Sequence, residues 1–287
     1  MRKAIFLIQT HDRKGLLAEI STFFYSHGYN ILLCRQYTDV RENMYFMRII
    51  IDLCEQTTRK QLEEDFARLA AKFDLHYSLY YDDVPQNVAI MVSKTSHCLY
   101  DLLMHAEEGD LDCRIPLIIS NHPDLESVAD RFRIPFYCCP IGAAGKAAQE
   151  KCVLDLLKRH RIDLVVLARY MQILSDHFIE QFPQRIINIH HAFLPAFQGG
   201  NPYERAWERG VKMIGATAHY VTEDLDEGPI IEQDVVRVTH EYGPEDLSRI
   251  GRDVEMMVLS RAVKAHLESR IIVHENRTVV FSGGAGA

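Results

Sequence analysis

The chain has 287 residues, of which 47% are hydrophobic and 25% are charged, as in an ordinary folded protein that is long enough for two domains. Its formal net charge of −8 and its pI near 6.0 argue against a broad surface for nucleic acid or anionic membranes, because such surfaces need clustered lysine and arginine. The N-terminal apolar stretch, Ala4 to Ile8, is too short for a signal peptide or a membrane span, and seven cysteines form no C-x-x-C pair. We therefore expect a cytoplasmic protein with reduced thiols that binds a small molecule.

The first 81 residues predict a βαββαβ unit with a ferredoxin-like fold. After a short first strand, Asp12 can cap a helix whose apolar residues Leu16 to Phe24 follow the 3.6-residue period, and Gly28 is typical of a helix end. Strands and a second helix follow from apolar or alternating runs. The expected strands cover 3–9, 29–38, 44–53 and 75–81, and the second helix carries Leu62, Phe66, Leu69, Ala70 and Phe73.

The segment Thr10 to Leu17, together with Tyr29-Asn30-Ile31, resembles the start of an ACT domain, a small regulatory fold that binds amino acids. The resemblance implies an effector such as glycine or methionine and a homo-oligomer formed through these domains. A glycine in the first helical turn lets a carboxylate approach the backbone N–H groups at the positive helix end. The implied ligand residues are Asp12, Gly15, Leu16 and Asn30. Alternatively, Asp12 only caps, Gly15 only packs, Asn30 only turns the chain, and the domain serves only for dimerisation.

The rest of the chain predicts an α/β domain with a Rossmann-like, doubly wound and mostly parallel sheet, because strands and helices alternate. We assign residues 1–82 to the ACT-like domain, 83–86 to a polar linker containing Pro85, 87–281 to the second domain and 282–287 to a flexible tail. A long helix after Gly243 is interpreted as scaffold, and 270–281 as a closing hairpin. The expected elements are strands at 88–92, 115–120, 135–139 and 163–168 and helices at 96–108, 124–132 and 147–160. Ligands of such sheets bind beyond the carboxyl ends of the strands.

Two later segments carry groups suited to catalysis. In Ile187 to Pro195 an apolar strand ends in Asn188 and His190, which are two residues apart and therefore share one face of the strand. An amide and an imidazole can then stabilise charge on one substrate oxygen. In Thr217 to Pro229 a strand enters an acidic loop that can supply a carboxylate to orient the imidazole.

These two segments, with Phe197 to Tyr203 between them, resemble the catalytic region of the folate-dependent formyltransferases. The resemblance covers most of 87–281 and implies Asn188, His190 and Asp226 as the catalytic residues. It also implies that the pterin ring lies against 168–174 and the loop 222–228, with folate as substrate and no cofactor. The implied substrate-binding residues are Arg169, Met171, Gln172, Ile173, Leu174, His219, Thr222, Glu223, Asp224 and Gly228. A purely structural role for His219 stays open.

One departure distinguishes members of that family. The nucleotide-accepting transferases carry a glycine-rich phosphate loop after their first strand, whereas Val92 to Cys98 contains no glycine. This resembles the members that pass the formyl group of 10-formyltetrahydrofolate to water and release formate and tetrahydrofolate. A transferase acting on a small amine such as glycinamide ribonucleotide and a non-catalytic sensor of folate or amino acids are the alternatives.

The histidines of these segments also suggest a metal site. His190, His191 and His219 could hold zinc, with Asp226 as an oxygen ligand. Adjacent residues of a strand point to opposite faces, so His190 and His191 are not expected to bind one ion. We expect no metal.

Overall fold

The computed structural model describes residues 2–53, 58–143, 145–195 and 202–283. The chain forms two compact units. The first consists of Met1–Pro85, Glu268–His274 and Val279–Ala287, and the second of Gln86–Leu267 and Glu275–Thr278. Residues 268–274 thus group with the first unit, although the sequence suggested the second domain for them. Residues 284–287 of the expected tail lie outside the described part of the chain.

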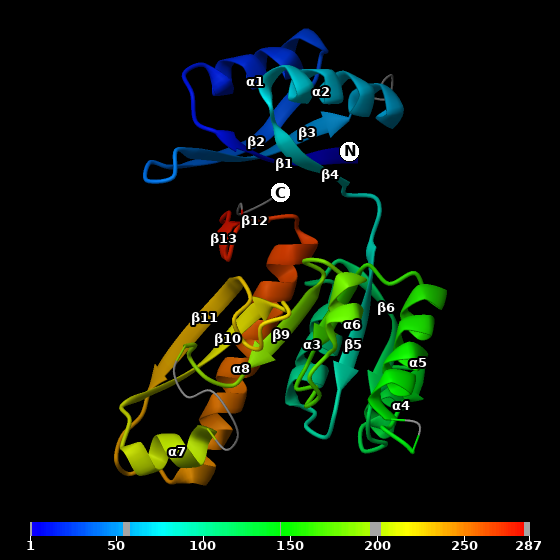
Figure 1. Cartoon of the computed structure of the whole chain (residues 1–287), viewed down its shortest axis with the longest axis vertical. Coiled ribbons are helices and arrows are strands. Elements are labelled where there is room, and N and C mark those ends of the chain that lie inside the picture. The colour runs from blue at the N-terminus through cyan, green and yellow to red at the C-terminus, as the bar shows by residue number, and fades with distance from the viewer. Residues whose placement is uncertain (1, 54–57, 144, 196–201, 284–287) are drawn as a thin grey trace. The chain divides into compact units, whose positions relative to one another are not determined.

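The first unit is a four-stranded antiparallel sheet in the order β2-β3-β1-β4, with α1 and α2 on one face (Figure 1). The elements are β1 (Arg2–His11), α1 (Leu16–Ser26), β2 (Asn30–Asp39), β3 (Met44–Leu53), α2 (Arg59–Phe73) and β4 (His76–Tyr81). Phe6 of β1, Phe24 of α1 and Phe66 of α2 are fully buried against one another and fill the core between helices and sheet. The expected βαββαβ order and the α/β class are confirmed.

The start of α1 differs from the expected cap. Gly15, with φ of 91°, occupies the N-cap position, and no side chain there bonds to the first turn; the backbone N–H of Asp12 instead donates to the carbonyl of Asn43. The prediction that Asp12 caps this helix is therefore wrong, because glycine is the residue that adopts this left-handed conformation without strain. Of the suggested effector residues, Leu16 is buried in the core, whereas Asn30 is exposed at the start of β2.

The C-terminal segment of the first unit packs on its sheet. Ile272 and Phe281 are buried against Leu7 and Phe46. Arg48 of β3 donates from Nε to the carbonyl of Ser269, at 2.8 Å, and from Nη2 to that of Glu268, also at 2.8 Å. These contacts explain why this segment groups with the first unit.

The second unit contains a seven-stranded sheet in the order β11-β10-β9-β8-β5-β6-β7, which is parallel from β9 to β7, while β10 runs antiparallel to both β9 and β11. Its strands are β5 (Gln86–Val92), β6 (Cys113–Ser120), β7 (Phe136–Cys138), β8 (Leu164–Leu167), β9 (Ile186–His190), β10 (Met213–Tyr220) and β11 (Ile230–Arg237). Its helices are α3 (His97–Glu107), α4 (Glu126–Arg131), α5 (Gly145–Arg159), α6 (Asp176–Glu180), α7 (Pro202–Arg209) and α8 (Pro244–Leu267). Apart from these two sheets, the last strands of the chain, β12 (Ile271–His274) and β13 (Arg277–Val280), pair with each other as the expected hairpin.

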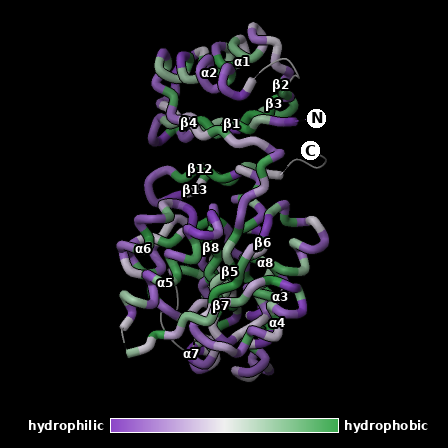
Figure 2. The backbone as a smooth tube through the Cα atoms, turned by 90° about the vertical axis from the view of Figure 1, so that its right-hand side faces the viewer, coloured by the Kyte–Doolittle hydropathy of each residue, from purple (hydrophilic) through white to green (hydrophobic). Residues whose placement is uncertain are grey.

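The central strands of this sheet are buried on both faces. Ala89 and Met91 of β5 pack in a core with α5 and α6, and Ile90 between them is buried on the opposite face. Figure 2 shows β5 and β8 as hydrophobic. Two-sided burial is what a doubly wound parallel sheet requires. Among the described residues, no helix is both long and apolar enough to cross a membrane.

Candidate active site

Three parallel strands, β5, β8 and β9, end at one edge of the sheet, where a cavity of about 950 Å³ opens within the second unit. Its walls come from the segment after β8, the end of β9, the acidic loop after β10 and the first half of α8. This is the place where ligands of doubly wound sheets bind. The cavity is large enough for a ligand of drug size.

Asn188 is held in place by the neighbouring strand. It pairs across the sheet with His219 of β10, and its amide Nδ2 donates to Nε2 of His219 at 3.2 Å. The other ring nitrogen of His219, Nδ1, lies 2.9 Å from the carbonyl oxygen of Tyr220 and therefore carries the proton. Burial lowers the pKa of His219, so the ring stays neutral and Nε2 can accept. The second N–H of Asn188 remains for a ligand in the cavity.

The imidazole of His190 donates a hydrogen bond to the carboxylate of Asp226. Its Nδ1 lies 3.3 Å from Asp226 Oδ1, and the hydrogen bond from His190 holds the pKa of Asp226 below its usual range. Because an ionised carboxylate only accepts, Nδ1 carries the proton. The other nitrogen, Nε2, is buried and has no hydrogen-bond partner in the described structure. A buried polar atom without a partner is unfavourable unless a ligand satisfies it.

A tight turn sets the position of Asp226, which has a positive φ of 58°. Two residues later, a Cβ on Gly228 would lie 1.8 Å from the carbonyl oxygen of Tyr220, so only glycine fits there. That carbonyl is also the acceptor for His219. Gly228 therefore shapes the loop, and it does not line the cavity as a suggested substrate-binding residue would.

The wall formed by 169–174 and 222–225 carries exposed apolar side chains among polar ones. Met171, Ile173 and Leu225 all line the cavity and are 59%, 61% and 59% exposed, although all three are large hydrophobic residues. The backbone N–H of Met171 donates to the hydroxyl of Ser93 at 2.9 Å, which fixes this segment to the end of β5. Exposed apolar side chains around a cavity are typical of a ligand-binding site.

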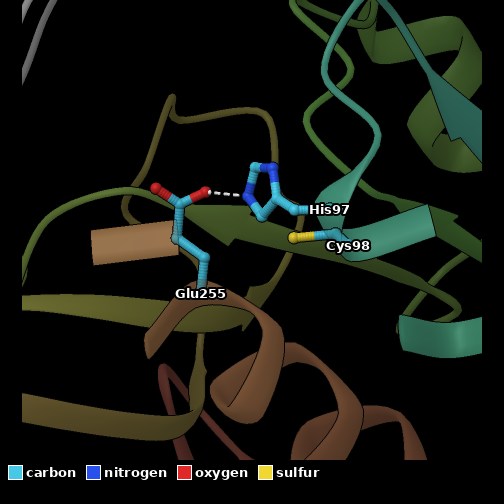
Figure 3. A group of neighbouring side chains, drawn as sticks. All are labelled: His97, Cys98 and Glu255. Carbon is cyan, nitrogen blue, oxygen red and sulfur yellow. Dashed lines mark hydrogen bonds and ion pairs between the residues drawn. The ribbon is translucent and has the colours of Figure 1, made fainter. Parts of the chain in front are cut away.

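A second polar cluster lies in the same cavity, around Glu255 of α8. The carboxylate is 1% exposed; its Oε2 lies 2.7 Å from Nε2 of His97 (Figure 3), and its Oε1 accepts from the Tyr203 hydroxyl at 2.6 Å. Arg169 Nε is 3.5 Å from Oε2. Burial by itself raises the pKa of Glu255, but the hydrogen bond from His97, the charge of Arg169 and the hydrogen bond from Tyr203 lower it below the usual range.

The sequence did not predict this cluster, and α8 was interpreted as scaffold. Glu255 lies four residues after Gly251 and four before Leu259, on the face of α8 that is buried. A charged residue in the apolar stripe of a helix needs a partner, and that was the available signal. Likewise, Arg169 belongs to the suggested pterin segment, but its side chain pairs with Glu255.

His97, Cys98 and Glu255 are also close enough to share a metal ion, with ligand atoms within 4.8 Å of one another. Burial raises the pKa of the Cys98 thiol well above its usual value, and the guanidinium of Arg169 lies beside the carboxylate. The guanidinium already neutralises the carboxylate and would repel a metal ion beside it, so this group fits a metal ion poorly.

The orientation of His191 differs from the expected one. The rings of His190 and His191 stack, with centroids 5.0 Å apart, and both line the cavity. They do not point to opposite faces, because β9 ends at His190 and the strand alternation stops there. Burial, followed by the charges of Arg169 and His190, lowers the pKa of His191 to about 4.

The cavity brings together every catalytic and substrate-binding residue suggested by the sequence except Gly228. These are Asn188, His190, Asp226, Arg169, Met171, Gln172, Ile173, Leu174, His219, Thr222, Glu223 and Asp224. Their roles stay predictions. Residues 197–201 of the resembling segment lie outside the described residues, whereas Tyr203 lines the cavity.

Two protein families match different parts of this chain. The Formyl transferase family matches residues 86–263, and the ACT domain family matches residues 4–71. A formyltetrahydrofolate deformylase from Synechocystis is 51% identical over 280 residues, which are 97% of this chain and 98% of that protein. The chain belongs to the formyltetrahydrofolate deformylase family.

Solved structures agree with membership of the deformylase family. The crystal structure of a formyltetrahydrofolate deformylase from Pseudomonas syringae has a TM-score of 0.95 and 44% sequence identity, and the match covers 98% of this chain and 95% of that one. A glycinamide ribonucleotide transformylase from Symbiobacterium toebii has a TM-score of 0.66 and 31% identity, covering 71% of this chain and 98% of that chain. The deformylase structure thus matches nearly the whole chain, and the transformylase a smaller part.

Proposed function

We propose that the chain hydrolyses 10-formyltetrahydrofolate to formate and tetrahydrofolate, with Asn188, His190 and Asp226 around the formyl group. The observation that carries this proposal is the meeting of these three side chains in one cavity whose wall carries exposed apolar side chains. The full-length similarity to proteins named formyltetrahydrofolate deformylase favours water as the acceptor.

In the proposed reaction, Asn188 and Nε2 of His190 donate hydrogen bonds to the formyl oxygen. Asp226 stabilises the positive charge of the His190 ring while Nε2 holds its proton. Water beside Asp226 attacks the formyl carbon, and the negative charge that develops on oxygen is stabilised by both donors.

The tetrahedral intermediate then collapses. The bond between the formyl carbon and the folate nitrogen breaks, and that nitrogen takes a proton from His190. One proton of the attacking water returns to the His190–Asp226 pair, and the other leaves to solvent as formic acid ionises to formate. The products are formate and tetrahydrofolate, and the ion pair is restored for the next cycle.

The test is to incubate the protein with 10-formyltetrahydrofolate and no amine. A hydrolase releases formate and tetrahydrofolate in equal amounts under these conditions. A transferase releases neither until an amine is added, and a sensor binds the folate without turnover. Binding without formate release would contradict the proposal.

We also propose that the ACT domain binds a small amino acid such as glycine or methionine, and that two copies of the chain pair through it. The support is the ACT match and the exposed Gly15 at the start of α1, an eleven-residue helix. Calorimetric titration with glycine and with methionine, in parallel with formate release, tests the effector. Sedimentation of the full chain tests the pairing, and no heat with no change of rate would contradict the regulatory role.

A further inference from the structure

A buried threonine of the neighbouring strand holds the main chain that follows His190. β9 ends at His190, and residues 191–194 form a bend. The hydroxyl of Thr217 on β10 donates to the carbonyl oxygen of Ala192 at 2.9 Å and accepts from the backbone N–H of Leu194 at 3.1 Å. Thr217 is 0% exposed, so water does not compete for these hydrogen bonds. One side chain thus fixes two main-chain groups of the bend.

Gln233 of β11 completes the network. Its Nε2 donates to the Thr217 hydroxyl at 2.9 Å and to the carbonyl oxygen of Leu194 at 3.2 Å. The hydroxyl has one hydrogen and two lone pairs, and the amide nitrogen has two hydrogens, so all of these are used. Moving the bend would leave buried polar groups without partners, which is costly. The network therefore fixes the bend to β10 and β11.

These hydrogen bonds lie beside a residue of the proposed site. Thr217 is the partner of His190 across the sheet, and Gln233 is in turn the partner of Thr217. Residues directly opposite each other in paired strands carry their side chains on the same face. Neither Thr217 nor Gln233 lines the cavity, so neither is placed to touch a substrate there. Any effect of these two residues on the reaction must pass through the residues that they hold.

The bend carries His191, and His191 packs against the ring of His190. The two rings stack, with centroids 5.0 Å apart and an angle of 23° between their planes. Asp226 contacts Nδ1 of the same His190 ring. Because the outer torsion of a histidine has a broad minimum, such contacts decide the direction of the ring. A shift of the bend would move His191 and allow the His190 ring to turn.

Resting on the proposed hydrolysis, we propose that Thr217 and Gln233 are positioning residues, which hold the bend 191–194 so that Nε2 of His190 points at the formyl group. Misplacement of a catalytic group by about 1 Å can cost about 10² in rate. Loss of this network should therefore lower kcat. It should leave the affinity for the folate almost unchanged, because the residues that line the cavity stay the same.

The test compares two substitutions of one residue. Thr217→Val keeps the shape and loses the hydroxyl, whereas Thr217→Ser keeps the hydroxyl. Gln233→Met loses both amide donors and is the second variant in case Thr217→Val does not fold. The matched control is Thr10→Val in the first unit, because Thr10 is also buried and its hydroxyl donates to the carbonyl oxygen of Asp74 at 3.0 Å. Steady-state formate release and the free energy of unfolding are measured for each protein.

We expect kcat to fall about 10- to 100-fold in Thr217→Val, with KM for the folate within about twofold of the wild type. It should fall in the same direction in Gln233→Met. Thr217→Ser should keep most of the rate, and Thr10→Val should lose stability but keep the wild-type kcat. Equal kcat values in Thr217→Val and Thr217→Ser, or a rise in KM with unchanged kcat, would overturn the proposal.

A second measurement does not depend on hydrolysis. Nitrogen NMR of the protein with isotope-labelled histidine reports the ring nitrogens, and the signals of His190 are assigned with His190→Gln. They should shift in Thr217→Val and keep their wild-type positions in Thr217→Ser and Thr10→Val. Unshifted signals in folded Thr217→Val would overturn the positioning. If the wild type releases no formate while the signals shift as expected, the proposed function fails and the positioning of the ring stands.

Discussion

Because the ring of His219 accepts a hydrogen bond from the amide of Asn188, we predict that His219 positions Asn188 for catalysis. The variant His219→Asn keeps a donor near the Tyr220 carbonyl, where Nδ1 lies, and loses the acceptor at Nε2. One hydrogen bond of this kind contributes about 1 kcal/mol, so kcat should fall about fivefold while KM for the folate changes little. His219→Gln places an amide oxygen near Nε2 and should restore most of the rate.

A double-mutant cycle measures the coupling. Asn188→Ala removes the donor to the formyl oxygen and should lower kcat by about 10² to 10³. If His219 acts through Asn188, adding His219→Asn to Asn188→Ala should cost nothing further, whereas an additional loss would point to Asp226, whose Oδ1 lies 3.8 Å from Nε2 of His219. The assay is steady-state formate release with the folded state checked by circular dichroism. Losses that multiply would refute a role confined to positioning Asn188, and a main effect on KM would indicate that His219 contacts the substrate itself.

Three predictions concern stability. Gly228→Ala should destabilise the fold by about 1–3 kcal/mol in denaturant titration, because the new Cβ would meet the Tyr220 carbonyl; wild-type stability would show that this turn accepts a side chain after all. Arg48→Met should lower the free energy of unfolding by about 3 kcal/mol, because two main-chain carbonyls of the C-terminal segment lose their donor. An unchanged free energy of unfolding would show that other contacts hold this segment. Burial, followed by the charge of Arg185, lowers the pKa of His266 to about 4. Between about pH 6.5 and 4 the unfolded chain therefore binds more protons than the folded one, and the free energy of unfolding should decrease as the pH is lowered. In His266→Gln the loss of unfolding free energy over this pH range should be smaller by at most about 3 kcal/mol. An unchanged pH dependence would show that other groups cause it.

Much of the fold could be predicted from the sequence because hydrophobic periodicity reports directly on burial. The alternating elements predicted the parallel sheet, and the strand ends pointed to the edge where the cavity lies. The start of α1 was predicted less well, since Asp12 and Gly15 are both plausible at a helix start and tertiary contacts decide between them. The C-terminal segment was also misplaced, because its partners, such as Arg48, lie more than 200 residues away in the sequence.

The site was predictable only in part. Asn188 and His190 are two residues apart, and strand geometry alone brings them to one face. The partners of Asn188 and of Glu255 come from other strands and helices, and no local pattern reveals such a pairing. Glu255 was detectable as a charge on a buried helical face, but its link to Arg169 and His97 depends on how α8 packs against the sheet.

The most direct test of the catalytic arrangement is formate release by Asp226→Asn together with its affinity for the folate. An amide keeps the shape of the carboxylate but cannot stabilise a protonated His190. We expect folate binding close to that of the wild type and almost no formate at neutral pH. Formate release at the wild-type rate would contradict the account, because the His190–Asp226 ion pair would then have no part in the reaction.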